Sequence, residues 1–203
     1  FYLPDDALPN LTLDLSSLSL VAAPVAGRSI TVEADDPLEP LLEVTADGAM
    51  VTIRQIALVG RERFAGIWPW GPETSRVRVT VPYNTRLDAS IDAGSISAEH
   101  RWEQVQVRTS AGSIRLGDCV SAQVHADAGS IVIGALHDGN VRAQAGSVRI
   151  RSTSGPVLAH TEAGSVKLVE AYEGSLDPFS YTPLRAHDTP EHLVCRLLLQ
   201  KNN

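Results

Sequence analysis

The chain has 203 residues, of which 43% are hydrophobic and 20% charged, a composition typical of a folded protein rather than a disordered one. Its formal net charge of −7 argues against nucleic acid as a partner, because a general nucleic-acid binder needs a basic surface to neutralise phosphates. No apolar run approaches the roughly 20 residues of a membrane-spanning helix, so no transmembrane segment is predicted in this chain.

Residues 1–80 are predicted to form strands and an N-terminal cap. Apolar and polar residues alternate in Leu11–Leu15, Ser29–Glu33, Met50–Arg54 and Arg76–Val81, which is the period of two that a half-buried strand requires. A long loop follows the third of these segments and carries Trp68 and Trp70. These tryptophans predict either an exposed binding tip or a lid packed on the end of the fold.

The triplet Ala-Gly-Ser, followed by Ile or Val, occurs five times between residues 93 and 166. Successive glycines are 18, 17, 17 and 18 residues apart, and such near-constant spacing is typical of a repeat architecture. The five glycines are Gly94, Gly112, Gly129, Gly146 and Gly164.

The residues on both sides of each triplet alternate between apolar and polar, which predicts two short strands for every repeat. Before the triplets, pairs such as Val107 and Thr109 are predicted to point inward. One repeat cannot bury its apolar face alone, so each strand should pair in parallel with its equivalent in the next repeat. The predicted fold is all-β, a parallel β-solenoid with irregular β caps, and right-handed winding is favoured because parallel crossovers are usually right-handed.

The prediction is a single domain over 1–203, with repeat coils over 81–176 and a C-terminal cap over 177–203. Each triplet is predicted to form the turn between the two strands of its repeat, which we call the corner. The alanine of the triplet is predicted to point inward there. The glycine should supply a positive φ, and the serine hydroxyls should bond either to the backbone at the corner or to one another along a ladder.

Four outward positions in successive repeats carry basic or imidazole side chains: Arg108, His125, Arg142 and His160. Arg115, Arg149 and Lys167 lie on the adjacent strand of their repeats. Such a stripe could hold an anionic glycan, although polar residues at outward positions also need no ligand. Together with Trp68 and Trp70, the first four are the candidate binding residues.

Catalytic, cofactor and metal motifs are not predicted. Neither a Gly-x-Ser-x-Gly elbow nor a phosphate-binding or dinucleotide-binding fingerprint occurs. Two weaker groupings are a local cluster at 187–192 and a column preceding the triplets. That column consists of Asp92, Ser110, Asp127, Gln144 and Glu162, and the polar residues within it separate the acids too far to share one ion. Cys119 and Cys195 are predicted either as free thiols or as a disulfide.

The five Ala-Gly-Ser-Ile/Val units, preceded by a strand ending in Val81-Pro82, resemble a bacterial adhesin-like family of domains of unknown function (DUF4097). The likeness runs from about residue 11 to 176 and is clearest over Arg76–Val81 and Asp92–Val166. The resemblance implies a short-coil parallel β-helix at a bacterial cell envelope and carries over no catalytic residues.

The expected function is therefore a non-enzymatic, adhesin-like binding or structural module whose partner is a cell-surface glycan or protein. A carbohydrate-active enzyme on the same scaffold and an intracellular protein-interaction domain remain alternatives. An extracellular or envelope location is expected. The cytoplasm stays open, because the chain begins at Phe1 and a leader or anchor before it is compatible with the sequence.

Overall fold

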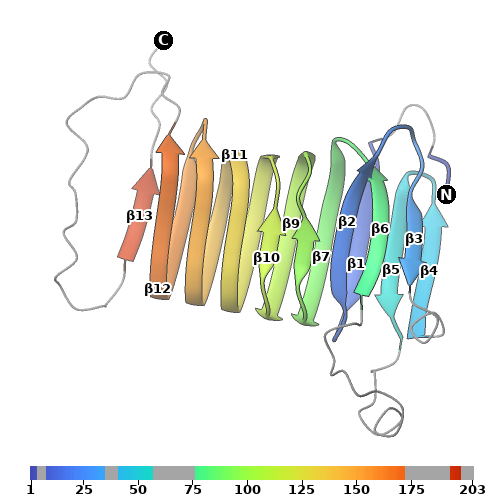
Figure 1. The fold of residues 1–203 in the computed structure, drawn as a ribbon, viewed down its shortest axis with the longest axis horizontal. Helices are drawn as coiled ribbons and strands as arrows, with labels where there is room; N and C mark the ends of the chain where they lie inside the picture. The colour runs from blue at the N-terminus through green and yellow to red at the C-terminus, as the bar shows by residue number, and fades with distance from the viewer. Residues whose placement is uncertain (4–7, 35–40, 57–75, 172–192, 198–203) are drawn as a thin grey trace, which may run out of the picture.

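The named elements within the described part of the chain are all β-strands (Figure 1). This computed structural model describes residues 1–3, 8–34, 41–56, 76–171 and 193–197, and all strands in these ranges belong to one curled sheet. Within them, no helix has the length and hydropathy needed to cross a bilayer. The all-β prediction is confirmed. The strands are β1 (Asn10–Leu15), β2 (Ser19–Val25), β3 (Thr31–Ala34), β4 (Leu42–Asp47), β5 (Met50–Gln55), β6 (Arg76–Pro82), β7 (Thr85–Ala93), β8 (Ile96–Ala98), β9 (Trp102–Ala111), β10 (Ile114–Leu116), β11 (Cys119–Thr153), β12 (Val157–Ala171) and β13 (Leu193–Leu197).

Parallel pairing organises the sheet into two walls. In the first wall, β9 pairs with β7 on one side and with residues 119–128 of β11 on the other. In the second wall, β10 pairs with β8 and with residues 131–133 of β11. β12 pairs with the remainder of β11 in both walls. The triplets therefore stack, since Ala111 is the register partner of both Ala93 and Ala128.

The N-terminal strands extend both walls in an order that differs from their order along the chain. β1 lies between β5 and β7 in the first wall, and β2 lies between β6 and β8 in the second. Antiparallel strands lie at the ends of the sheet: β4 against β5, β3 against β6, and β13 against β12. They cover strand edges that would otherwise offer unpaired backbone groups to another chain.

The core lies between the two walls and is built from the apolar residues that the alternation predicts. The prediction is confirmed before the triplets, where Val107 is fully buried and Thr109 is buried beside it. After the triplets, Ile96, Ile114, Ile131 and Val148 are buried. Because side chains alternate across a strand, one face of each strand packs inside and the other carries polar groups to solvent.

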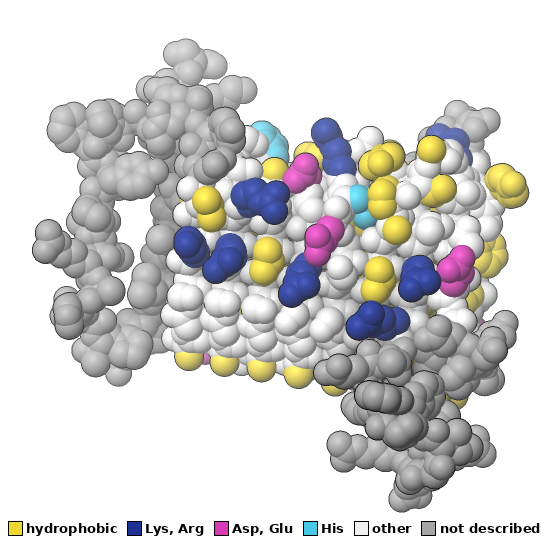
Figure 2. Space-filling model, viewed as in Figure 1, with side chains coloured by type: hydrophobic (Ala, Val, Ile, Leu, Met, Phe, Trp, Pro, Cys, Tyr) yellow, Lys and Arg dark blue, Asp and Glu magenta, His cyan; other side chains and the backbone are white. Residues whose placement is uncertain are grey.

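The prediction for the alanines of the triplets is wrong. All five are exposed, and Figure 2 shows a row of hydrophobic side chains along the lower edge of the molecule. The chain turns at this corner instead of continuing as a pleated strand, so the period of two breaks and two successive residues before each glycine face outward. The exposed residues are Ala93, Ala111, Ala128, Ala145 and Ala163.

The glycines of the triplets form the closely stacked part of the corner. Four of them have φ between +136° and +149°, a region that side-chain-bearing residues rarely adopt, as predicted. A Cβ atom added to Gly129 would overlap the backbone carbonyl oxygen of Gly112 in the neighbouring triplet. Beside the glycines, the Ser113 and Ser130 hydroxyl oxygens are 3.3 Å apart, one step of the predicted hydroxyl ladder.

The opposite corner contains a buried histidine. His100 is 7% exposed, and its ring centroid lies 4.2 Å from that of the fully buried Trp102. The Trp102 indole Nε1–H donates to the Ala98 carbonyl oxygen at 2.9 Å, whereas both His100 ring nitrogens are buried without a hydrogen-bond partner. Burial disfavours the charged imidazolium and lowers the pKa of His100 to about 4.

Candidate functional site

The four predicted basic and imidazole residues lie on one line across the first wall. Arg108 in β9 is the register partner of His125 in β11, and Arg142 in β11 is the register partner of His160 in β12. Both arginines are exposed and both histidines are half-buried. We call these four residues the first-wall column. Neighbouring strands lie about 4.8 Å apart, so the column presents one such side chain on each neighbouring strand segment.

Polar neighbours on the same wall hold part of this column. The His125 Nε2 atom lies 3.1 Å from Asp127 Oδ1, and the pair becomes an ion pair when the imidazole is protonated. The Arg142 Nε–H donates to Asn140 Oδ1 at 3.2 Å. Neighbouring side chains therefore fix the His125 imidazole and the Arg142 guanidinium. The Nδ1 atom of His160, by contrast, is buried without a hydrogen-bond partner.

Two shallow depressions border the column. One, of about 280 Å³, is lined by Arg108, His125 and Arg142 together with the side chains described below. The other, of about 410 Å³, shares His125 and Arg142 and adds His160 and Glu162. Their linings combine cationic donors with neutral and anionic acceptors. Such surfaces suit hydroxyl-rich or anionic groups that lie on the wall rather than a ligand enclosed in a cleft.

The sequence interpretation missed the amides beside the column. Gln106, Gln123 and Asn140 line the first depression, and Gln106 is the register partner of Gln123 in the neighbouring strand segment. Their positions are 17 residues apart, so the spacing that identified the basic residues also contained this signal. Amide groups both donate and accept hydrogen bonds, which makes the depression a recognition surface for uncharged polar groups as well as anions.

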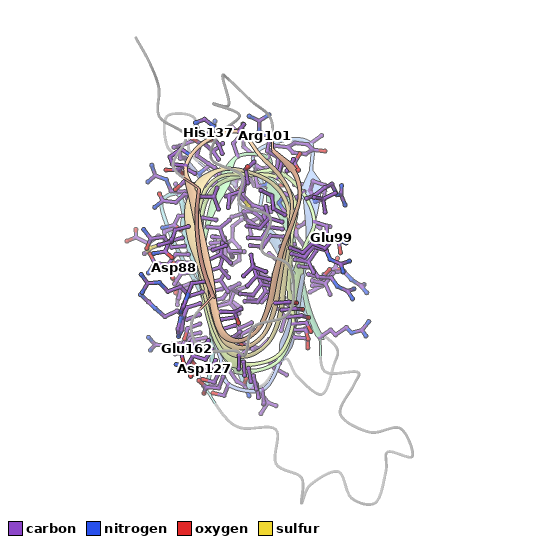
Figure 3. All side chains as sticks on the ribbon, turned by 90° about the vertical axis from the view of Figure 1, so that its left-hand side faces the viewer. Asp88, Glu99, Arg101, Asp127, His137 and Glu162 are labelled. Atoms are coloured by element: carbon purple, nitrogen blue, oxygen red, sulfur yellow. The ribbon has the colours of Figure 1, made fainter. Side chains whose placement is uncertain are left out.

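Arg115, Arg149 and Lys167 do not share this wall. They lie in the β10, β11 and β12 segments that form the second wall, because the chain turns at the triplet between each column residue and the next strand. Figure 3 shows the two walls from the end of the molecule, with Asp88 labelled on one side and Glu99 on the other. The basic residues of the sequence therefore form two separate surfaces.

The column of residues that precedes the triplets lies where the first wall meets the triplet corner, and Figure 3 labels Asp127 and Glu162 there. Within the described ranges, no group of three or more His, Cys, Asp or Glu side chains could hold a metal ion. Trp68, Trp70 and the cluster at 187–192 lie outside the described residues.

Cys119 is a buried free thiol, so the structure contains no disulfide at this cysteine. The backbone of Cys195 lies in β13 opposite Ala159. Burial, and next the negative charge of Asp118, raise the pKa of Cys119 to about 12.

Cys119 is therefore expected to be inert in the folded protein. In a Cys195→Ser variant at pH 8, labelling of Cys119 by Ellman's reagent should be at least about a hundredfold slower than in urea, because only the thiolate reacts and burial suppresses it. Absorbance at 412 nm follows the reaction. Equal rates in buffer and in urea would contradict the buried position.

Comparison with solved structures shows a similar fold. The chain is similar to a crystal structure of a "putative cell adhesion protein" from Clostridium sporogenes, with a TM-score of 0.52 and 12% identity over 81% of this chain and 93% of that one. A "putative adhesin" from Bacteroides fragilis gives a TM-score of 0.38 and 9% identity, covering 84% of this chain and 93% of that one. No family model matches the chain, and no curated protein matches it in sequence. The first of these likenesses extends to the fold alone.

Proposed function

We propose that this chain is a non-enzymatic, adhesin-like binding module of the bacterial cell envelope, built as one right-handed parallel β-solenoid. The in-register line of the first-wall column, bordering both depressions, carries the proposal. Its partner would be a surface glycan or a surface protein that lies along the wall. The cell-adhesion name of the Clostridium sporogenes structure supports an adhesive role and an extracellular or envelope location.

Two features support the solenoid interpretation. The register between β11 and β12 joins residues 18 apart through two strands and the corner between them, from Val141↔Ala159 to Ile150↔Leu168. The sense of winding also agrees. In Figure 3 the C-terminal end faces the viewer, and the chain descends the wall of Asp88, turns near Asp127 and ascends the wall of Glu99.

The distribution of carboxylates favours binding over hydrolysis. Glycoside hydrolysis needs two carboxyl groups that face one scissile bond. On the first wall, Asp88, Asp127 and Glu162 belong to different windings, and Asp127 contacts His125. The depressions are also shallow, so they suit adhesion along a surface better than the exclusion of water from a reaction.

A glycan and cell-wall array, with wild type compared to an Arg108→Ala/Arg142→Ala variant, tests the proposal. We expect the variant to lose about tenfold or more in affinity for the bound component, because two charge-assisted contacts are removed. An Arg86→Ala/Arg101→Ala variant is the matched control, since it removes the same charge at exposed positions outside the column. Unchanged binding by the column variant, or an equal loss in the control, would contradict the role of this wall.

A further inference from the structure

The second wall carries its own set of cations. Arg115, Arg149, Arg151 and Lys167 are all exposed and lie in β10, β11 and β12. Arg149 and Lys167 are register partners in adjacent windings, and Arg151 lies two residues along the strand from Arg149. Figure 2 shows this face, on which dark blue side chains gather across the middle. We call these four residues the second-wall column.

These cations lack the partners that hold cations on the first wall. Among the described residues, none of the four has an ion-pair or hydrogen-bond partner. On the first wall, Arg54 Nε lies 3.6 Å from Asp14 Oδ2 and Arg142 is held by Asn140, whereas Arg108 also has no such partner among the described residues. The difference is notable in a chain with a net charge of −7, which has more than enough acids to neutralise its cations.

Placing like charges directly opposite each other in a sheet also costs stability. Arg149 and Lys167 occupy such positions, and Arg151 adds a third cation to the same patch. Opposed like charges are destabilising. Figure 2 also shows a few magenta acidic side chains on this face, but none of them forms an ion pair with these cations among the described residues. The arrangement is one that an external anion would relieve, because each cation would gain a partner and the repulsion between neighbours would be screened.

The surroundings of this column indicate what kind of anion fits. The serines that follow the corner glycines form a hydroxyl column on the same side, and their hydroxyls can bond to one another, as at Ser113 and Ser130. From β8 to β12, the described outward residues of this wall include no aromatic side chain. Binding of single-stranded nucleic acid normally uses aromatic side chains on which bases stack. Hydroxyls beside cations instead suit a sugar that carries carboxylates.

We propose that the second-wall column binds a linear anionic polysaccharide, with carboxylates along its length, that lies parallel to the long axis of the molecule. Arg149 and Lys167 repeat the cationic position in adjacent windings about 4.8 Å apart, and Arg115 lies beyond Val132, which is its own register partner. Several carboxylates of one chain are therefore engaged at once. This surface is distinct from the first-wall column, and the inference goes beyond the proposed function.

Polygalacturonate is the probe for the test, with titration calorimetry at two salt concentrations. An Arg149→Gln/Lys167→Gln variant is expected to bind about tenfold or more weakly than wild type, and the slope of log K against log salt should fall by roughly one to two because fewer counterions are released. The charge-preserving variant Arg149→Lys/Lys167→Arg is expected to retain binding. Unchanged affinity in the glutamine variant would overturn the proposal.

Further measurements distinguish this mode of binding from binding by the first wall, from nucleic-acid binding and from a loss of fold. The Arg108→Ala/Arg142→Ala variant should lose less affinity for polygalacturonate than the glutamine variant does, and an equal or greater loss would place the site on the first wall and overturn the proposal. Neutral dextran should not bind, and tighter binding of an oligothymidylate than of polygalacturonate would overturn the polysaccharide assignment. The melting temperature of the glutamine variant should equal or exceed that of wild type, since a like-charge contact is removed, so loss of binding would not reflect loss of fold.

Discussion

Substituting alanine for Gly129 is expected to destabilise the protein by at least about 4 kcal/mol, among the largest effects of a single substitution. Two causes combine at this position. The backbone has φ of +136°, which is strained for alanine, and the added Cβ would overlap the carbonyl oxygen of Gly112. The neighbouring backbone cannot move aside freely, because the Gly112 N–H donates to the Ala128 carbonyl oxygen at 3.0 Å. Urea denaturation followed by circular dichroism measures the loss.

Gly27→Ala is the matched control for this prediction. Gly27 has a similar φ of +123°, but a Cβ added there meets no atom within 4 Å. The control therefore isolates backbone strain, which should cost about 1 to 3 kcal/mol. If Gly129→Ala costs no more than Gly27→Ala, the close stacking of the corner is refuted.

The second large effect is an acid-dependent loss of stability that arises from His100. Its pKa is about 4 in the folded protein and near 6.5 when unfolded. As the pH falls below 6.5, the unfolded chain therefore takes up a proton that the folded protein does not. The stability contributed by the neutral, buried imidazole is complete above pH 6.5 and is lost by about pH 4, and the loss amounts to about 3 kcal/mol.

A His100→Phe variant should remove this acid sensitivity. Phenylalanine retains an aromatic ring against Trp102, and the folded protein loses no hydrogen bond because neither imidazole nitrogen has a partner. Free energies of unfolding from urea titrations at pH 7, 6, 5 and 4.5 should decline less steeply for this variant than for wild type. At pH 7 the variant should be as stable as wild type or more so.

His137→Gln is the control for general histidine effects. His137 is exposed, and its Nδ1 atom lies 3.0 Å from the Ser154 hydroxyl oxygen. This variant should keep the wild-type dependence on pH. If wild type and His100→Phe lose stability in parallel between pH 6.5 and 4, the buried, neutral state of His100 is wrong.

The site was predictable to the extent that it depends on spacing. Residues 17 or 18 apart occupy equivalent positions, so the sequence could align Arg108 with His125 and Arg142 with His160, and the structure places them in register. The same spacing could have found the amides at 106, 123 and 140. The depressions could not be predicted, because their shape depends on how neighbouring side chains of different length pack across the wall.

The comparison with a solved structure from Clostridium sporogenes supports a likeness in fold. The residues that carried the resemblance are those that shape the corners and strands. These residues explain a likeness in fold. The binding roles of both columns depend instead on the outward side chains, and binding measurements on the column variants test them.

The sequence by itself determined the strands, the inward side chains and the need for glycine at the corner. Each depends on a local property: side chains alternate with a period of two along a strand, and only glycine readily adopts a positive φ. The alternation does not describe the turn itself, so Ala128 and its equivalents were assigned to the wrong side.

Only the tertiary structure decided the order of the strands in the sheet and the separation of the charges. β1 lies between β5 and β7 because pairing depends on contacts between strands far apart in the chain, and no local pattern specifies which edge a strand joins. In the same way, the turn at each triplet sends Arg108 and Arg115 to opposite walls. Residues seven apart therefore serve two surfaces, because the direction of a side chain depends on the path of the folded backbone.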